Sequence, residues 1–529
     1  MCLGHQAETR LDALSVSGLT AVLLKEVEMS RFHSPISRRD FMKALGFTGA
    51  GLGGVAALTS PAFHDLDELM SSNGNYYGYE VGDGYIPNLP WYVKHKEYYE
   101  PTVPIDWDHK WRVDGRHARD YNVKESKWFF DAYSLEQAKK YVEWQQGYDP
   151  KYNWKDPRRQ ALDSASQAIN SFVPKLTFLG QTPTKTPEKT GYPKWTGTPK
   201  ENMNLLRGIA RFFGCDDIGV IEDGPQLERL TTTYDMESAK IDRENVEAPY
   251  VETNTKGTVT RKVIPTSFKW SFVWTFRQNI DMTRVQQGGI MKAWPDYNPL
   301  GAGENAAVWY CYSRMSIIEI RLMQFIRALG YDCVAGGMSA ITSGTALATV
   351  NGLLEHARMG QVALHPKYGA TVRSTYKMWT NMPLVPTRPI DAGIYEFCKT
   401  CEICAEACPG QVIQRNDPTW TTGRNPEDGN DNGTFGEPLP YQAQGFLGWR
   451  TDIGKCPHCP MCQGTCPFNE MPEASWLHTL VKATAANTTV FNKFFADMDR
   501  TFKYGHKLEA DYFDERFGKM PTYGIDTMR

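Results

Sequence analysis

The most regular alternation of apolar and polar positions in the chain lies between residues 268 and 276. Every second position there is aromatic: Phe268, Trp270, Phe272, Trp274 and Phe276. Because the side chains of a strand point alternately to its two faces, this period of two predicts a β-strand with five rings on one face. Packing in a core explains such a row, since aromatic residues dominate protein cores. Lining of a large planar cofactor is the alternative.

Apolar residues at helical spacing predict two helices, over residues 201–213 and 314–329. A short apolar strand follows each helix, at 218–221 and at 331–335. Strands that alternate with helices predict a parallel or mixed sheet, and the ligands of such sheets gather at the carboxyl ends of the strands. We therefore expect an α/β unit in which the turn at Gly336-Gly337 forms a candidate pocket wall.

Composition divides the body of the chain into successive segments. Residues 63–198 are rich in Tyr, Trp, Pro and Lys without clean periodicity, which is typical of a segment that wraps around a core formed elsewhere. Residues 199–390 carry the α/β pattern, and residues 391–475 contain two dense cysteine runs. The tail, residues 476–529, is aromatic and charged, and we expect it to be helical in part and to pack back over the core.

The residues before this body contain the pattern of an export signal. Residues 37–43 read Ser-Arg-Arg-Asp-Phe-Met-Lys, and a Gly/Ala-rich stretch follows to Ala62. This is the twin-arginine pattern, which predicts a signal peptide over residues 29–62 and export of the folded protein. Residues 1–28 show neither periodicity nor a basic run, so we expect translation to begin at Met29.

Charge and motif content exclude several classes of partner. The 529 residues carry a net charge of −3 and no basic block beyond the signal, which argues against a nucleic-acid partner. The chain has no GxGxxG run and no P-loop, so nicotinamide and ATP chemistry have no support. The three cysteines outside the runs and the N-terminal segment are expected to be buried thiols: Cys215, Cys311 and Cys333.

Two cysteine runs of identical spacing are the strongest chemical signal. They are Cys398, Cys401, Cys404 and Cys408-Pro409, then Cys456, Cys459, Cys462 and Cys466-Pro467. Ferredoxins with two 4Fe–4S clusters have this spacing, and the fourth cysteine of each run ligates the other cluster. The spacing therefore assigns Cys398, Cys401, Cys404 and Cys466 to a first cluster, and Cys456, Cys459, Cys462 and Cys408 to a second. A zinc site leaves the third cysteine, the fourth cysteine and the proline of each run unexplained.

These features together resemble one family. The twin-arginine signal, the α/β unit and the doubled cysteine runs occur in one chain, and from Met29 to about Asn469 it resembles the corrinoid-dependent reductive dehalogenases. The resemblance implies an α+β or α/β fold, with a nitroreductase-like corrinoid-binding domain at 199–390 and a ferredoxin-like two-cluster domain at 391–475. It also implies a cobalamin-type corrinoid bound base-off. In agreement, no histidine lies in the Asp-x-His-x-x-Gly pattern that supplies a lower cobalt ligand elsewhere.

The resemblance carries two catalytic residues to this sequence. Tyr312 matches the proton-donating tyrosine of the family, with Tyr310 as the second choice, and Arg373 matches the arginine beside that phenol. A phenol with a pKa of about 10 in water is a poor acid at neutral pH, and a fixed guanidinium stabilises the phenolate that remains after proton transfer. The structural alternatives are a buried tyrosine and a surface ion pair.

Further positions are expected at the cofactor and the substrate. Gly336, Gly337, Met338 and Tyr368 are candidates for corrinoid binding. Met338 stands where some family members have a polar amide, so an apolar residue there would change which haloalkene fits. Trp449 and Tyr441 are candidates for an aromatic substrate pocket, with core packing as an equal alternative.

The implied activity is two-electron removal of halide from an organohalide, a chlorinated ethene or ethane, at a cobalt(I) corrinoid fed by two 4Fe–4S clusters. This is the terminal step of organohalide respiration. The implied partners are an electron-donor protein or quinol chain and a small integral-membrane anchor, at the outer face of the cytoplasmic membrane. Two alternatives remain open: an exported ferredoxin-type electron carrier without corrinoid, and an epoxyqueuosine-reductase-like enzyme, which the export signal disfavours.

Overall fold

The computed structural model divides the chain into two units, Met1–Asn75 and Tyr76–Arg529. All described residues lie in the second unit: 84–87, 89–110, 112–113, 178–180, 185–285, 306–337, 341–374, 376–408, 412–420, 445–451, 460–470 and 475–502. The predicted segments 1–28 and 29–62 lie outside these residues. The predicted divisions at 198, 390 and 475 fall inside the second unit and stay predictions.

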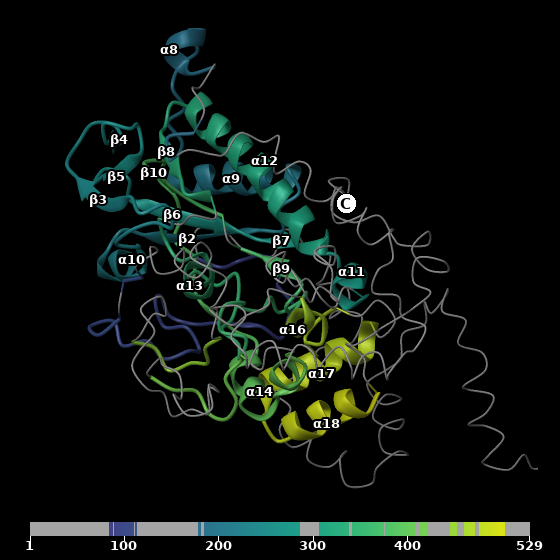
Figure 1. The fold of residues 1–529 in the computed structure, drawn as a ribbon. Helices are drawn as coiled ribbons and strands as arrows, with labels where there is room; N and C mark the ends of the chain where they lie inside the picture. Colours follow the sequence, from purple (N-terminus) through teal and green to yellow (C-terminus); the bar gives the residue numbers. More distant parts are fainter. Residues whose placement is uncertain are drawn as a thin grey trace, which may run out of the picture. The chain divides into compact units, whose positions relative to one another are not determined.

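A four-stranded antiparallel sheet forms the centre of the α/β part (Figure 1). Its order is β2 (Ile218–Glu222), β6 (Trp270–Trp274), β10 (Lys377–Thr380) and β8 (Cys333–Ala335). The prediction of a parallel or mixed sheet was wrong here. The connection from β6 to β8, which run in the same direction, passes through β7, α11 and the long helix α12 (Ala306–Ala328). However, β10, from later in the chain, lies between them, so every pair of neighbours is antiparallel.

The aromatic row of residues 268–276 forms β6 and the start of β7 (Phe276–Arg277) from Trp270 onward, whereas Phe268 lies before the strand and packs with Val273 on the opposite side, so the prediction of five rings on one face was wrong for Phe268. Phe272 and Trp274 are fully buried against the helices α12 and α9 (Pro199–Phe212). Val273, on the opposite face, is also fully buried and packs with residues of α13 (Gly344–Val350). The sheet is therefore covered on both sides, and the row serves core packing rather than an open face.

The two predicted helices are present with different bounds. α9 begins at a capping box in which the Thr198 hydroxyl accepts from the backbone N–H of Glu201, and the Glu201 carboxylate accepts from the N–H of Thr198. This arrangement pairs backbone donors that a helix start otherwise leaves unpaired. α12 begins at Ala306 rather than residue 314. As a result, Tyr310 and Tyr312 lie within the helix.

The smaller elements complete the α/β part. β3 (Lys240–Glu244), β5 (Val259–Pro265) and β4 (Tyr250–Thr253) form a mixed three-stranded sheet, in which β3 is parallel to β5. β7 pairs with β9 (Val372–Arg373), and β1 (Lys94–His95) pairs with β11 (Ile390–Asp391). The remaining helices are α8 (Pro187–Thr190), α10 (Pro225–Leu230) and α11 (Ile280–Val285).

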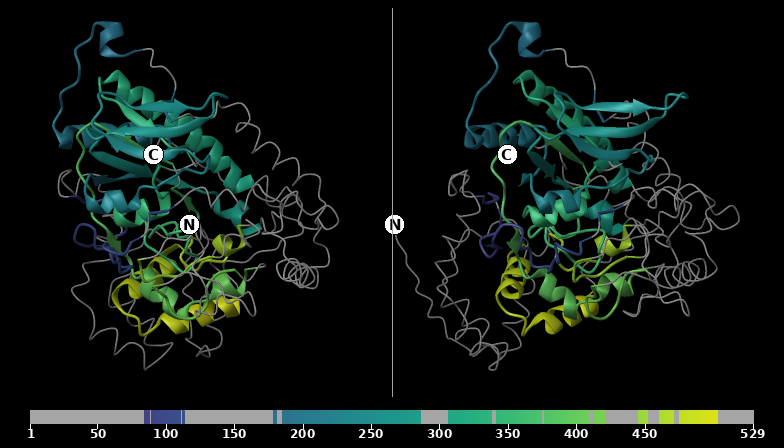
Figure 2. Two further views of the ribbon diagram at one scale, coloured as in Figure 1. Left: turned by 60° about the vertical axis from the view of Figure 1, so that its left-hand side comes forward. Right: turned by 90° about the vertical axis from the view of Figure 1, so that its left-hand side faces the viewer.

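The cysteine-bearing part contains short helices, one of which contacts the helices of the tail. These helices are α14 (Ile394–Thr400), α15 (Ile403–Glu406) and α16 (Met461–Gly464). The tail helices α17 (Ser475–Asn487) and α18 (Asn492–Phe502) contact α14 and lie beside it in each view (Figure 2). Gly393, at φ +73°, allows this contact, because a Cβ there would lie 2.3 Å from the carbonyl oxygen of Ala485.

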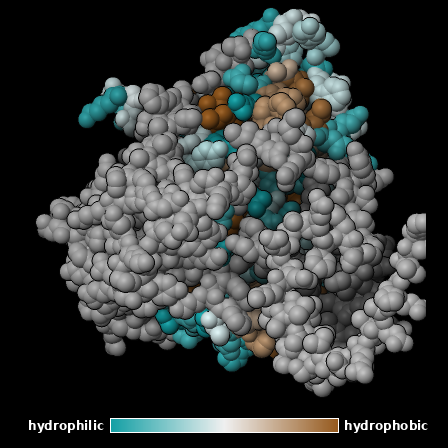
Figure 3. Space-filling view, turned by 90° about the vertical axis from the view of Figure 1, so that its right-hand side faces the viewer, coloured by the Kyte–Doolittle hydropathy of each residue, from teal (hydrophilic) through white to brown (hydrophobic). Residues whose placement is uncertain are grey.

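The described helices have no membrane-spanning candidate, since none of them is both long and apolar enough to cross a bilayer. On the face in Figure 3, the described apolar residues lie beside polar ones.

Candidate functional site

Tyr312 and Arg373 lie next to each other. α12 carries Tyr312, while Arg373 ends β9 and is paired in register with Phe276 of β7. The Arg373 guanidinium carbon lies 5.5 Å from the centre of the Tyr312 ring, within the range of a cation–π contact. Trp309, one turn earlier on α12, packs edge-on against the same ring with centroids 6.0 Å apart. The two residues assigned by resemblance are thus brought together, while their catalytic roles stay predictions.

A buried glutamine, which sequence reasoning missed, orients Arg373. Nη2 of Arg373 donates to Oε1 of Gln463 at 3.2 Å, and Nε2 of Gln278 donates to the same oxygen at 3.2 Å. Gln463 is 3% exposed and lies on α16, directly after Cys462. Its position inside the second cysteine run was the available signal, but the spacing rule concerns only the cysteines. We call Tyr312, Arg373, Gln463 and Gln278 the tyrosine–arginine site.

Some buried polar atoms around this site have no protein partner. Among the described residues, Nε of Arg373, Nε1 of Trp274 and Oε2 of Glu319 are buried without a hydrogen bond. Most buried polar atoms in proteins are paired, so unpaired ones need a reason. Unpaired polar atoms of this kind are expected where a polar ligand completes a site.

The Gly336-Gly337 turn is held by two buried ionisable side chains. The N–H of Gly337 donates to Oε1 of Glu319 at 3.1 Å, and Nζ of Lys377 donates to the Gly337 carbonyl oxygen at 3.2 Å. Burial raises the pKa of Glu319 to about 8 and lowers the pKa of Lys377 to about 7. Gly337 has φ +53°, a left-handed conformation that favours glycine. Met338 lies outside the described residues.

A second phenol near the site was also missed. Tyr376 lies just before β10, and its hydroxyl is 2.7 Å from Oγ of Ser316, one turn after Tyr312 on α12. Burial raises the pKa of Tyr376 to about 12, and the charge of Glu319 adds to the increase. Tyr310, the second choice for the donor, is 37% exposed and packs against Arg314 instead.

Tyr368 belongs to a separate hydrogen-bonded cluster. Its hydroxyl donates to Oδ1 of Asp216 at 2.8 Å, and Nε2 of His365 lies 3.2 Å from Oδ2 of the same carboxylate. The Arg277 guanidinium lies 4.9 Å from the Tyr368 ring centre. Burial and the neighbouring Asp216 raise the pKa of Tyr368. The hydroxyl is thus already paired within the protein, and a role in corrinoid binding stays a prediction.

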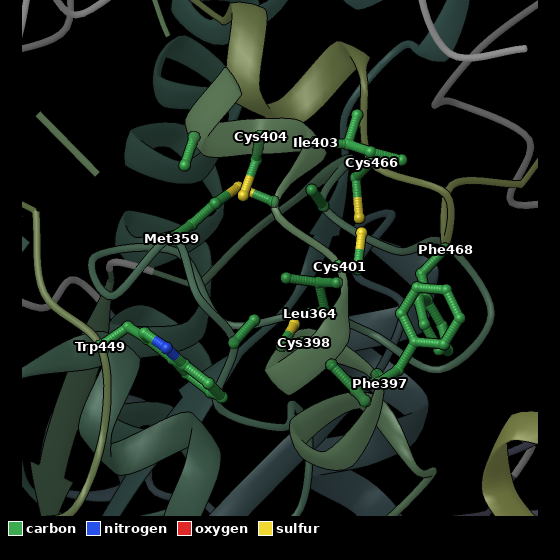
Figure 4. Packing of buried hydrophobic residues seen from close by; sticks show 14 of the residues in the cluster. Met359, Leu364, Phe397, Cys398, Cys401, Ile403, Cys404, Trp449, Cys466 and Phe468 are labelled. Carbon is green, nitrogen blue, oxygen red and sulfur yellow. The ribbon is translucent and has the colours of Figure 1, made fainter. Parts of the chain in front are cut away.

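Five described cysteines of the two runs are buried in one core, and four of them are considered first. Cys398, Cys401, Cys404 and Cys466 lie together, and the sulfur atoms of Cys401 and Cys466 point toward each other (Figure 4). We call the buried residues around these four the cysteine core. Burial raises the pKa of Cys398 to about 11 and the pKa of Cys401, Cys404 and Cys466 as well. The spacing predicts these four as the ligands of the first cluster, and this assignment stays a prediction, because Cys408 of the other predicted set is buried in the same core.

The second set is described only in part. Cys408 is buried in the same core and Cys462 packs at its edge, while Cys456 and Cys459 lie outside the described residues. α15 contacts α16, so the two runs lie side by side. Among the described side chains, no group of three or more His, Cys, Asp or Glu could hold a metal ion. A cubane differs from such a site, because its four thiolates bind four separate irons.

Trp449 lies in the cysteine core. It is fully buried, its ring stacks on His356 at 6.3 Å, and its Nε1 donates to the Asn416 carbonyl oxygen at 2.9 Å. This placement favours core packing over a substrate pocket wall. Tyr441 lies outside the described residues.

Residues 88–384 match the family described as "Reductive dehalogenase subunit". The chain is 33% identical over 94% of its length to the chloroethene reductive dehalogenase of Dehalococcoides mccartyi strain VS, and the match covers 99% of that protein. It is 28% identical over 90% of its length to the trichloroethene reductive dehalogenase of D. mccartyi strain 195, covering 95% of that protein.

Solved structures show the same fold. The catabolic reductive dehalogenase NpRdhA matches 78% of this chain with a TM-score of 0.52 at 17% identity. A reductive dehalogenase whose structure is described as suggesting a mechanism for B12-dependent dehalogenation matches the same share, with a TM-score of 0.51. The chain spans about half the length of these solved chains, 49% in each case. Their likeness supports a mixed α/β fold of this type.

The family match covers more than half of the chain, and the chloroethene enzyme is similar along almost its whole length. The chain belongs to the reductive dehalogenase family, oxidoreductases that act on carbon–halogen bonds.

Proposed function

We propose that this reductive dehalogenase removes halide from a chlorinated ethene or ethane, using two 4Fe–4S clusters and a base-off cobalamin-type corrinoid. The observation that carries the proposal is the Arg373 guanidinium over the Tyr312 ring, joined through Gln463 to the second cysteine run. The similarity to enzymes named for chloroethene and trichloroethene supports the substrate class. In this proposal the α/β part is a nitroreductase-like domain, and the cysteine-bearing part beside it is a ferredoxin-like domain.

The reaction consumes two electrons and one proton: R–Cl, 2 e⁻ and H⁺ give R–H and Cl⁻. A bound corrinoid would supply the reducing chemistry for cleavage of the carbon–halogen bond, and clusters held by the two cysteine runs would supply single electrons. The Tyr312 hydroxyl donates its proton to the carbon that loses chloride. The Arg373 guanidinium then stabilises the phenolate, which takes up a proton from solvent before the next turnover.

The residues of the chain fit both kinds of cofactor. Four buried thiols from two runs suit a cubane, and the unpaired atoms of Arg373, Trp274 and Glu319 suit a polar macrocycle with amide side chains. In this proposal Gly336, Gly337, Met338 and Tyr368 contact the corrinoid. Apolar residues near Tyr312, such as Trp309, would favour a chlorinated hydrocarbon over a polar substrate.

The proposal includes export by the twin-arginine route to the outer face of the cytoplasmic membrane. It is supported by the Ser-Arg-Arg-Asp-Phe-Met-Lys pattern at residues 37–43. At that location the enzyme would take electrons from a donor protein or quinol chain and would be held by a small integral-membrane anchor.

Metal analysis and halide release of the same preparation test the proposal. Holoprotein purified without oxygen should contain about one cobalt and about eight irons per chain. It should release chloride from members of a panel of chlorinated ethenes and ethanes when a low-potential reductant is supplied. Iron without cobalt, and no chloride release, would show an electron carrier and would overturn the proposal.

A further inference from the structure

Arg358 is a fully buried arginine that the proposed chemistry does not use. It is 0% exposed, and its neighbours Ala357 and Met359 belong to the cysteine core. Nε donates to the carbonyl oxygens of Cys398 at 3.1 Å and Cys401 at 3.0 Å, and Nη2 donates to that of Cys398 at 2.7 Å. The guanidinium therefore binds the backbone of two cysteines assigned to the first cluster.

The rest of the guanidinium is also fixed. Nη1 donates to the carbonyl oxygens of Gln414 at 3.0 Å and Asn416 at 2.9 Å, and the group lies 4.9 Å from the Trp449 ring centre. Trp449 in turn donates to the Asn416 carbonyl. The positive charge is thus held in one orientation and is separated from water.

Among the described residues, one carboxylate is paired with this charge. Oε1 of Glu402 lies 3.2 Å from Nη1, and the Glu402 side chain is 28% exposed. Solvent screens a partly exposed carboxylate more than a buried guanidinium, so Glu402 compensates the positive charge of Arg358 only in part.

A fixed positive charge favours the reduced state of a neighbouring cluster. Reduction adds one electron, and net charge, hydrogen bonds and solvent exposure are the terms that set the potential of an iron–sulfur cluster. On the basis of the proposed function, we infer that Arg358 is a positioning residue that raises the reduction potential of the cluster held by Cys398, Cys401, Cys404 and Cys466. It acts through its charge and through the two cysteine carbonyls that it orients.

Other buried ionisable side chains lie near the same thiols, and an Arg358 variant contains them as the wild type does. Lys482, which is 5% exposed, donates to the Lys367 carbonyl oxygen at 2.7 Å and acts on Cys466. Asp499 acts on Cys401 and Cys466, and Glu355 acts on Cys398. A difference between wild type and an Arg358 variant therefore isolates the contribution of Arg358.

The test is a potentiometric titration of the holoenzyme, followed by electron paramagnetic resonance. We compare Arg358→Gln, which removes the charge, with Arg358→Lys, which keeps it. Arg450→Gln is the matched control, because Arg450 is 4% exposed and binds the carbonyls of Gly448 and Phe446 rather than those of the cysteines. In Arg358→Gln, the midpoint potential of one cluster should fall by about 59 mV, which corresponds to a one-electron reduction that is about tenfold less favourable.

Arg358→Lys should shift the same cluster less, and Arg450→Gln should leave both clusters unchanged. Unchanged midpoints in Arg358→Gln with all eight irons present, or an equal shift in Arg450→Gln, would overturn the inference. If Arg358→Gln loses iron, Glu402→Gln replaces it: the same midpoint should rise, and no rise overturns the inference. Absence of clusters from the wild-type protein would instead refute the proposed function.

Discussion

Arg358 and Arg373 lie in two different regions of the molecule, and the guanidinium group has different partners in each. In the cysteine core, Arg358 directs five hydrogen bonds to four backbone carbonyls. In the tyrosine–arginine site, Arg373 donates to one side-chain amide, lies over an aromatic ring and has a buried Nε without a partner among the described residues. The first guanidinium is satisfied by the protein, whereas the second is not.

This difference reflects what each region has to hold. A cluster that only accepts and passes on electrons needs a rigid frame, and bonds to backbone carbonyls provide it. A site where a carbon–halogen bond is broken needs polar groups that are free for ligand and product. The two regions also touch, because Gln463 lies on the cysteine-bearing helix α16 and contacts Arg373. Strain or movement at one can therefore reach the other.

The largest expected effect comes from breaking the cysteine core. Cys404→Ser and Cys466→Ser come from different runs, yet each should remove the same cluster, about four of eight irons, and abolish turnover. Iron content and the electron paramagnetic resonance signals of the reduced protein measure this. Cys408→Ser is the matched comparison and should remove the other cluster. Loss of different signals in Cys404→Ser and Cys466→Ser would contradict the crossed assignment.

In the tyrosine–arginine site, Tyr312→Phe should lower turnover by about 10²- to 10⁴-fold, the usual contribution of a positioned proton donor. The ring and its contact with Arg373 are kept, so cobalt and iron contents should equal those of wild type. The measurement is chloride release under single-turnover and steady-state conditions. Tyr310→Phe is the control and should retain most activity, while near-normal turnover of Tyr312→Phe would show that another group supplies the proton.

Local patterns predicted local structure well. The period of two at residues 268–276 and the helical spacing at 201–213 correspond to β6, β7 and α9. The direction of neighbouring strands was missed, because periodicity carries no information about which strands pair. β10 inserts between β6 and β8 only through long-range contacts, such as Met378 paired with both Phe272 and Ala335.

The same difference between local patterns and long-range contacts applies to the candidate site. The segments around Tyr312 and Arg373 resemble family motifs, and the cysteines follow a known spacing. The sequence could therefore predict which of these residues lie close together. Gln463 and Arg358 are single polar residues without a pattern, and their importance depends on burial, 3% and 0% exposed, which only the folded chain shows. Trp449 was a candidate for the pocket by residue type alone, and residue type does not distinguish a pocket wall from a core.

A smaller effect is expected at the contact between the regions. Gln463→Met removes the acceptor from Arg373 and should lower kcat about tenfold with little change in KM, as expected for about 1.4 kcal/mol lost in the transition state. Gln463→Glu keeps the acceptor but adds a negative charge that offsets the guanidinium, so kcat should fall as well. Gln414→Met, at an equally buried glutamine of the cysteine core, is the control for general destabilisation. Equal kinetics in the two methionine variants would remove Gln463 from the site.

The last effect concerns stability rather than activity: a pH dependence that comes from a buried histidine of the cysteine core. Burial, with the charge of Arg450, lowers the pKa of His356 to about 3. Below the unfolded-state pKa of about 6.5, the unfolded chain binds a proton at this histidine that the folded protein does not bind. The folded protein therefore becomes less stable as the pH decreases, and the loss reaches about 2 kcal/mol at pH 5. Above about pH 6.5 this contribution to pH dependence vanishes.

His356→Phe keeps a ring beside Trp449 but cannot titrate, so the drop in thermal midpoint between pH 7 and pH 5 should be smaller than in wild type. The comparison uses the difference between the two pH values, because the substitution itself alters packing at both. An unchanged drop in His356→Phe would mean that His356 is hydrated or protonated in the folded protein, and the cysteine core would then be less closed to water than the tightly bound Arg358 indicates.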